Sequence, residues 1–494
     1  MANKMNISDR FKIEPKQPSV WVAILPLVAL VAMLALAIKS FGTGAIEGGS
    51  QVALLFASAV GAALAIWLCG CKWQTLEDAI VENIRTSASA IIILLLIGAI
   101  SGTWMVSGVV PTFIYYGLQV IHPKLFLGVA CIICAMVSLV TGSSWTTIAT
   151  IGVALMGIGR AEGFSEGWIA GAIISGAYFG DKVSALSDTT VLASASARVP
   201  LFEHIRYMMI TTIPSFVLAL VVFFGVSLTA THDSSEQISH ISESLSATFN
   251  LSPWLMLVPV CTALFILRRL PALITLFVAV VVACVAMVLF QPDVVVQIGG
   301  EGRFASFRAL MIACSSNTAI NTGDAALNDL VSTSGMAGML NTVWLILCAM
   351  CFGGVMAGSG MLAAITQLFL RFVHRTTAIV ASTVGTGLFC NLTTADQYIS
   401  IIITGNTFRT LYRERGLEAR LLSRSVEDSA TVTSVLVPWN SCGMTQSTVL
   451  GVATLTYLPY CLFNIISPIL SIVVAAVGYK IYRRRDEEPT LSDI

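Results

Sequence analysis

The chain has 494 residues, of which 56% are hydrophobic and only 11% are charged, and its formal net charge is zero. Soluble domains average about 25% charged residues, so this composition excludes an ordinary soluble protein, and the zero net charge argues against a nucleic-acid partner. Repeated apolar runs of about 20 residues are typical of helices that span a lipid bilayer. The composition therefore predicts an all-α, polytopic integral membrane protein.

The predicted elements follow a basic N-terminal tail, residues 1–19. The long apolar runs of the first half, residues 20–230, are Trp21–Ile38, Val52–Leu68, Ala90–Val109, Leu125–Leu139 and Ile205–Leu228. Two shorter apolar segments, Ile148–Ile158 and Trp168–Gly180, are interrupted by small and polar residues. Helices are interrupted inside a membrane only where the freed backbone is buried in protein or lines a wet cavity.

The first interruption is the segment TGSSWTT, residues Thr141–Thr147. After Gly142, the hydroxyl groups of Ser143 and Ser144 would supply oxygen atoms, together with free backbone N–H groups at the ends of half-helices. Small residues also let membrane helices pack closely, and that packing role is the alternative for this segment.

The next segment, GDKVSALSDTT, places two carboxylates and an ammonium group at membrane depth. Asp181 and Asp188 are seven residues apart and would share one face of a helix, with Ser184 between them. Carboxylates are costly in hydrocarbon unless they face a partner, a cation or water. With the hydroxyl of Thr189, these oxygens suit a hard cation such as Na⁺. Alternatively, Lys182 pairs with one acid and the motif holds the fold.

Residues 231–250 are acidic and serine-rich without Lys or Arg, which predicts an external polar loop between two halves. The long apolar runs of the second half, residues 251–482, are Trp254–Leu267, Leu273–Leu289, Met339–Met356 and Tyr457–Ile481. Its shorter segments are Phe304–Ala313, Ile379–Leu392, Gln397–Ile403 and Val432–Leu436. Together the two halves predict about 11 to 13 membrane-embedded helices or half-helices.

The second half repeats the pattern of a polar break followed by an acidic stretch. The segment CNLTTADQY contains Asn391, Thr394 and Asp396, and the segment EDSATVTSVLVPWNSCG begins with Glu427 and Asp428. These acids could bind a cation, or they could cap the N-termini of helices, where carboxylates are favoured. The later segment also carries Asn440, whose side-chain carbonyl would lie at membrane depth. Corresponding breaks in two halves indicate an inverted-repeat transporter with its site near the middle of the membrane.

Basic residues near the ends of the spans predict the orientation. Four occur in the N-terminal tail, the C-terminal tail of residues 483–494 begins with three arginines, and the loop Asn406–Arg424 is also rich in arginine. Basic loops stay on the cytoplasmic side. Both termini are therefore expected to be cytoplasmic, in a multi-pass protein of the cell's inner membrane.

At these residues the chain resembles the NhaC family of Na⁺/H⁺ antiporters, within the ion transporter superfamily. The matching strings are GAIISGAYFGDKVSALSDTT, LFEHIRYM, TIGVALMGIG, ADQYISI, SRSVEDSATVTSVLVPWNSCG and VLGVATLTYLPYCLFN. The resemblance implies inverted repeats, each with a re-entrant hairpin and a broken helix. Family members include malate/lactate exchangers and presumed amino-acid carriers. The chain departs from the family pattern at Ala185 and Val435, where proline is expected, and at Val191, where asparagine is expected.

The leading hypothesis is a secondary active transporter that exchanges Na⁺ for H⁺, and the alternative is a Na⁺- or H⁺-coupled carrier of a small organic anion or amino acid. The expected ion- and proton-binding residues are Asp181, Asp188, Asp396, Ser184, Thr189 and Asn391. The expected supporting residues are Lys182, Ser143, Ser144, Thr394, Glu427, Asp428 and Asn440. No nucleophile–base pair suggests an enzyme, and no cofactor or transition metal is expected. A homodimer in the lipid bilayer is left open.

Overall fold

The computed structural model describes residues 18–41, 48–229, 235–268, 270–322, 328, 331–371 and 375–482. Within these ranges the regular elements are all helices, with one isolated β-bridge between Thr318 and Thr333. The expected all-α fold is therefore confirmed. The predicted tails, residues 1–19 and 483–494, lie outside the described residues apart from residues 18 and 19.

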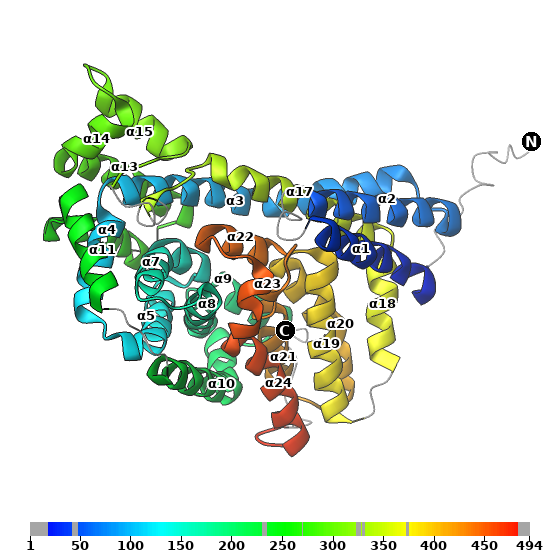
Figure 1. Cartoon of the computed structure of the whole chain (residues 1–494). Coiled ribbons are helices and arrows are strands. Elements are labelled where there is room, and N and C mark those ends of the chain that lie inside the picture. The colour runs from blue at the N-terminus through cyan, green and yellow to red at the C-terminus, as the bar shows by residue number, and fades with distance from the viewer. Residues whose placement is uncertain are drawn as a thin grey trace, which may run out of the picture.

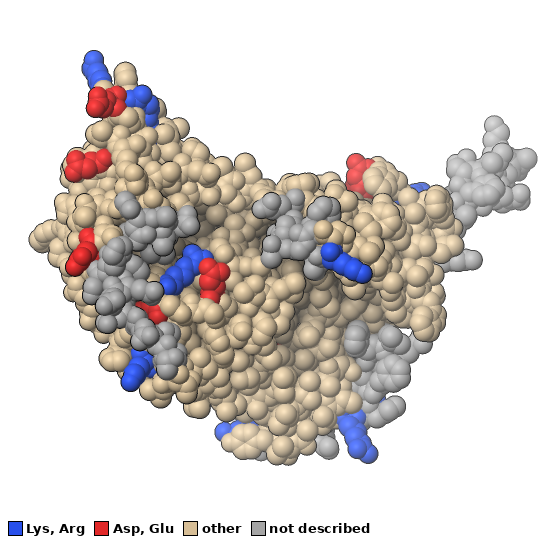
Figure 2. Space-filling model, viewed as in Figure 1, with Lys and Arg blue, Asp and Glu red and all other residues tan. Residues whose placement is uncertain are grey.

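In the described ranges, seven helices are long and apolar enough to cross a membrane. They are α1 (Val20–Phe41), α2 (Gly49–Cys69), α3 (Trp73–Val106), α5 (Phe126–Thr141), α10 (Leu201–Thr229), α13 (Ala272–Phe290) and α17 (Leu340–Gly358). Two bent helix pairs would raise the number to nine, namely Ser242–Thr248 with Pro253–Thr262 and Thr454–Tyr460 with Leu462–Val477. Figure 2 shows a largely uncharged face, as expected for a protein surrounded by lipid.

The expected external loop is largely helical. Helix α11 (Ser235–Thr248) occupies most of residues 231–250. Its Leu245 and the following Phe249 are buried in the hydrophobic core, four residues apart. Such spacing gives a helix one apolar face, so this polar segment folds against the body of the protein.

The remaining helices include those that carry the breaks. In the first half they are α4 (Val109–Val120), α6 (Ser144–Thr147), the π-helical turn η4 (Ile148–Gly152), α7 (Val153–Ala161), α8 (Glu166–Val183) and α9 (Asp188–Ser196). In the second half they are α12 (Leu257–Leu267), α14 (Pro292–Gly299), α15 (Ala305–Ser315), α18 (Met361–Arg371), α19 (Thr376–Thr394), α20 (Gln397–Glu414), α21 (Ala419–Val426), the π-helical turn η7 (Glu427–Thr431), α22 (Ser441–Leu450), α23 (Thr454–Tyr457) and α24 (Leu462–Val477).

The breaks follow the same order in both halves. In the first half, residues 142–143 separate α5 from α6, and residues 184–187 separate α8 from α9. In the second half, residues 395–396 separate α19 from α20, and residues 437–440 precede α22. The paired interruptions seen in the sequence are thus real interruptions of helices.

The two halves interleave in space. Helices α1 and α2, from the start of the chain, pack on α17 and α18 of the second half (Figure 1). Gln51 of α2 donates a hydrogen bond from its amide to Asn341 of α17 at 2.9 Å. Conversely, α13 and α15 pack on α3. Each half therefore covers part of the other.

Helices α5 and α8 make an especially close contact beside the first break. A Cβ atom at Gly176 would lie 2.1 Å from the carbonyl oxygen of Cys131, and one at Gly180 would lie 2.2 Å from that of Ala135. Glycines four residues apart allow the backbones of membrane helices to touch. This contact places the end of α8, with Asp181, directly against the break that follows α5.

Candidate functional site

A polar cavity of about 680 Å³ lies where the breaks of the two halves meet. Acids from both halves line it, namely Asp181 and Asp188 from the first half and Asp396 from the second. The other polar lining residues are Ser87, Ser89, Thr141, Ser143, Ser144, Thr146, Ser187, Thr189, Thr275, Gln397, Tyr398 and Ser441. Two sequence motifs more than two hundred residues apart thus contribute to one cavity.

Four helices of the described chain begin at this cavity, namely α6, α9, α20 and α22. Their first backbone N–H groups are capped by the side chains of Ser143, Ser187, Asp396 and Asn440. Helix N-termini carry a partial positive charge and favour nearby negative groups. The cavity therefore stabilises its own carboxylates and would also attract an anion.

Asp181 joins the two breaks of the first half. Ser144 donates two hydrogen bonds to the same carboxylate oxygen, from its backbone N–H at 3.1 Å and from its hydroxyl at 2.7 Å. A Cβ atom at Gly142 would lie 2.7 Å from the carbonyl carbon of Leu186, so the two breaks are in direct contact. Asp181 is 6% exposed and faces the cavity from the last turn of α8.

Asp396 has the corresponding position in the second half. Its carboxylate caps α20 by accepting a hydrogen bond from the N–H of Ile399 at 3.0 Å, so the capping interpretation is correct for this residue. The hydroxyl of Ser441, at the start of α22, lies 3.5 Å from its other oxygen. The backbone N–H of Ser441 also donates to the carbonyl of Ala395 at 2.8 Å. Asp396 thus joins the two breaks of its own half.

Asp188 differs from the other two acids because its side chain is exposed toward the cavity. The expectation that Asp181 and Asp188 share one helix face is wrong, since α8 ends at Val183 and a new helix begins at Asp188. The neighbouring Thr189 lines the cavity, and its hydroxyl lies 2.9 Å from that of Ser187.

Other predicted residues hold the breaks in shape and do not line the cavity. The hydroxyl of Ser184 accepts a hydrogen bond from the N–H of Leu186 at 3.2 Å. The amide of Asn391 donates to the carbonyl of Ala430 at 2.8 Å, and the amide of Asn440 donates to the carbonyl of Asn391 at 3.2 Å. Thr394 accepts a hydrogen bond from the N–H of Asp396 at 3.3 Å.

Lys182 pairs with an acid, but that acid is Asp428, far along the sequence. Both side chains are fully buried, and the hydroxyl of Ser467 lies 3.0 Å from the ammonium group. The capping interpretation is wrong for Glu427 and Asp428, because α21 continues directly into η7 and no helix begins there.

Sequence reasoning missed several cavity residues, notably Ser187, Gln397, Tyr398 and Ser441. They lie at or directly after helix caps, so a search for capping residues beside each acidic motif would have found them. In the described ranges, no three acidic, Cys or His side chains are grouped closely enough to hold a metal ion. A cation bound at Asp181 or Asp396 would therefore need hydroxyl, backbone or water oxygens as its other ligands.

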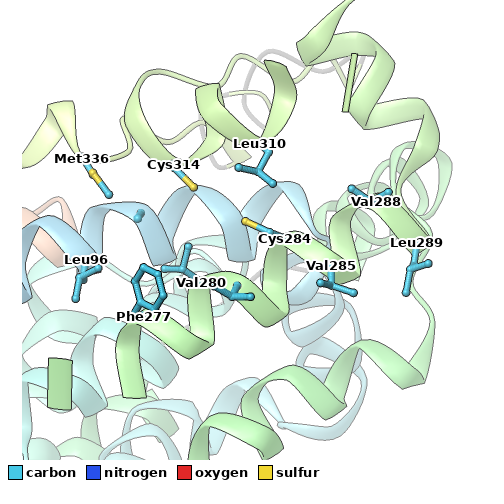
Figure 3. A pocket seen from close by; sticks show the side chains of 12 residues that line it. Leu96, Phe277, Val280, Cys284, Val285, Val288, Leu289, Leu310, Cys314 and Met336 are labelled. Carbon is cyan, nitrogen blue, oxygen red and sulfur yellow. The ribbon is translucent and has the colours of Figure 1, made fainter. Parts of the chain in front are cut away.

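A second cavity, of about 580 Å³, is different in character (Figure 3). It lies beside α3, α13 and α15, and its lining is apolar apart from the thiols of Cys284 and Cys314. Without oxygen ligands or charges, this cavity is not suited to a cation.

Comparison with known proteins shows that this chain is similar to antiporters along most of its length. The profile described as the Na⁺/H⁺ antiporter family matches residues 176–479. The chain is 35% identical to the Na⁺/H⁺ antiporter NhaC of Bacillus subtilis, with 84% of this chain and 89% of that protein covered. It is 34% identical to the arginine/ornithine antiporter ArcD of Halobacterium salinarum, with 96% and 95% covered. It is 33% identical to the malate-2H⁺/Na⁺-lactate antiporter of Bacillus subtilis, with 87% and 89% covered.

Proposed function

Because this chain belongs to the Na⁺/H⁺ antiporter family, as its motifs indicated, we propose that it exchanges Na⁺ for H⁺ across the membrane. The observation that carries the proposal is one cavity, lined by Asp181 from the first half and Asp396 from the second half of a multi-pass membrane protein. Buried acids at membrane depth mark ion and proton pathways.

The geometry supports exchange through competition between a cation and a proton. Asp181 offers a cation its carboxylate, and the hydroxyl of Ser144 beside it is a further oxygen ligand. Thr189 and Ser187 add hydroxyl oxygens to the same cavity. Movement of one half against the other would expose this site to each side in turn. Binding of Na⁺ on one side would then require release of the proton there.

A second candidate is a coupled carrier of a small organic anion or amino acid. The cavity of about 680 Å³ is far larger than one Na⁺ needs, and the helix N-termini around it would bind a carboxylate group. Two relatives are named for arginine/ornithine and for malate and lactate. In this case Na⁺ or H⁺ would be the coupling ion.

We also propose the membrane in which the protein lies and its orientation there. We place it in the inner membrane, with both termini cytoplasmic because Lys and Arg gather near them, and we expect transport without covalent chemistry. Reporter fusions at each terminus that are active only in the cytoplasm test this orientation. Activity of an external reporter at either end would contradict it.

Reconstitution into lipid vesicles tests the function. Vesicles loaded with Na⁺ are diluted into Na⁺-free buffer while lumenal pH is recorded, and exchange acidifies the lumen. The measurement is repeated with arginine, ornithine, malate or lactate present. A pH change with Na⁺ alone supports Na⁺/H⁺ exchange, and a change that requires one added substrate supports the second candidate. No pH change under any condition would refute Na⁺/H⁺ exchange and the H⁺-coupled form of the second candidate.

A further inference from the structure

A cluster of buried charges lies outside the cavity, where α8, α10, α21 and α24 lie together (Figure 1) and α21 continues into η7. Lys182 and Arg424 supply two positive charges, and Asp428 and Glu427 supply two carboxyl groups. All four side chains are fully buried. Buried charges are costly unless they are paired, so the four groups must compensate one another.

Asp428 is the acid at the centre of this cluster's contacts. It pairs with Lys182, and Arg424 lies 3.8 Å away. The hydroxyl of Thr211 lies 2.8 and 3.0 Å from the two oxygens of Asp428, and Ser467 donates to one of them at 3.1 Å. Both carboxylate oxygens of Asp428 therefore have close polar partners.

Glu427 is the opposite case. In the described part of the chain, neither of its carboxyl oxygens makes a hydrogen bond of normal geometry. It lies in the π-helical turn η7, a distortion that is frequent at functional sites. It does not line the cavity. Unlike Asp428, Glu427 therefore has no hydrogen-bond donors among the described residues that would hold its carboxylate ionised.

The charges around Glu427 connect it with the cavity. Asp181 and Lys182 are consecutive residues of α8, and Lys182 pairs with Asp428, the residue next to Glu427. A negative charge on Glu427 would be attracted by Lys182 and repelled by Asp181 and Asp428. A cation bound to Asp181 would cancel one of the two opposing charges. Cation binding in the cavity would therefore favour proton release from Glu427, and by linkage a proton on Glu427 would weaken cation binding. This is the direction of coupling that exchange requires.

A row of charged side chains leads from Asp428, the neighbour of Glu427, toward the surface. Arg420, Arg424 and Asp428 follow one another at four-residue intervals, and Arg420 is partly exposed and pairs with Glu203. Among the described residues, the guanidinium nitrogens of Arg424 make no hydrogen bond, and neither does Nε2 of His204, whose other ring nitrogen lies 2.8 Å from the hydroxyl of Ser423. Buried groups of this kind ordinarily bind internal water, along which a proton can move.

We propose that Glu427 is a proton-binding residue of this transporter, separate from the cation cavity and coupled to it through the charges of Asp181 and Lys182. This inference rests on the proposed function, because it requires that protons move against a coupled solute. It assigns the cation to the cavity and a transported proton to a carboxyl group that the cation does not touch.

The test separates cation movement from proton movement in reconstituted vesicles. Exchange of radiolabelled Na⁺ for unlabelled Na⁺ at equal pH reports the cavity alone, and lumenal acidification driven by a Na⁺ gradient reports coupling. For Glu427→Gln we expect Na⁺/Na⁺ exchange to continue, while acidification falls to the rate of protein-free vesicles. If the wild type requires an added substrate, both assays include it.

Two further variants complete the design. Glu162→Gln is the matched control, because Glu162 is also a buried acid without a hydrogen bond to either oxygen among the described residues, and both activities should persist. Glu427→Asp should restore acidification with an altered pH profile. Full acidification by Glu427→Gln would overturn the proposal, and so would loss of Na⁺/Na⁺ exchange in both Glu427 variants. Failure of the wild type to acidify would instead count against the proposed function.

Discussion

Individual carboxylates carry the proposed chemistry, and Asp181 is the one most firmly placed by its neighbours. It accepts two hydrogen bonds from Ser144 at the start of a helical run. A side-chain amide could accept the same hydrogen bonds but could not cycle a proton or balance a cation.

We expect Asp181→Asn to abolish Na⁺-driven acidification while the protein remains folded and inserted. Na⁺ should raise the unfolding temperature of the wild type, because a ligand stabilises the state that binds it, and this effect should vanish in the variant. Asp293→Asn, an exposed acid in the first turn of α14, is the control. Normal acidification by Asp181→Asn would show that the cation binds elsewhere.

Lys182 has a structural role that can be measured separately. Lys182→Ala leaves Asp428 buried without its closest partner, and breaking a buried pair costs roughly 3 to 5 kcal/mol. Thermal unfolding in detergent should show this loss. Arg85→Ala removes the exposed ion pair with Glu82 and should have little effect, because exposed pairs contribute little. Equal stability of the two variants would contradict the assigned role of Lys182.

At the scale of the helices, the breaks are held together by close backbone contact. Gly142 has a φ of +67°, and a Cβ atom there would strike Leu186 of the second break. Gly142 therefore allows the turn and also the approach of one break to the other.

Gly142→Ala should slow transport by more than its effect on stability alone would predict. Gly478→Ala is a matched control, because Gly478 has a φ of +72° with nothing within 4 Å of its added Cβ. Both variants strain the backbone, but only the first pushes the two breaks apart. Initial rates of Na⁺-driven acidification, normalised to folded protein, make the comparison. Equal rates would show that the contact between the breaks is unimportant.

The sequence predicts the breaks better than it predicts the partners across them. Gly142 and the hydroxyl residues after it determine the backbone conformation at their own positions, so the local pattern locates the break correctly. The partner of Lys182 lies 246 residues away, and no local pattern identifies it. Glu427 and Asp428 resemble the start of a helix in sequence, yet tertiary packing continues the helix through them. Short-range propensity is a weak guide wherever packing decides.

At the scale of the whole molecule, residues of both halves line one cavity, so Na⁺ binding there should affect residues of both halves. In a variant without native cysteines, Thr189→Cys and Ser441→Cys should both react with a membrane-impermeant thiol reagent, and Na⁺ should slow both reactions. Ser215→Cys, fully buried in α10, should remain unreactive. Labelling would be followed by mass spectrometry. Protection of only one position by Na⁺ would argue against a site formed by both halves.

The interleaving of the halves also has a consequence for how the chain is made. Gln51 of α2 and its partner Asn341 of α17 are 290 residues apart in sequence. At synthesis rates of about 5 to 20 residues per second, α2 leaves the ribosome roughly 15 to 60 s before its partner. During that interval its inward face must rest against lipid or an assisting protein. Biogenesis therefore includes a long-lived, half-made intermediate, and a chain truncated before α17 would be a natural target for membrane quality control.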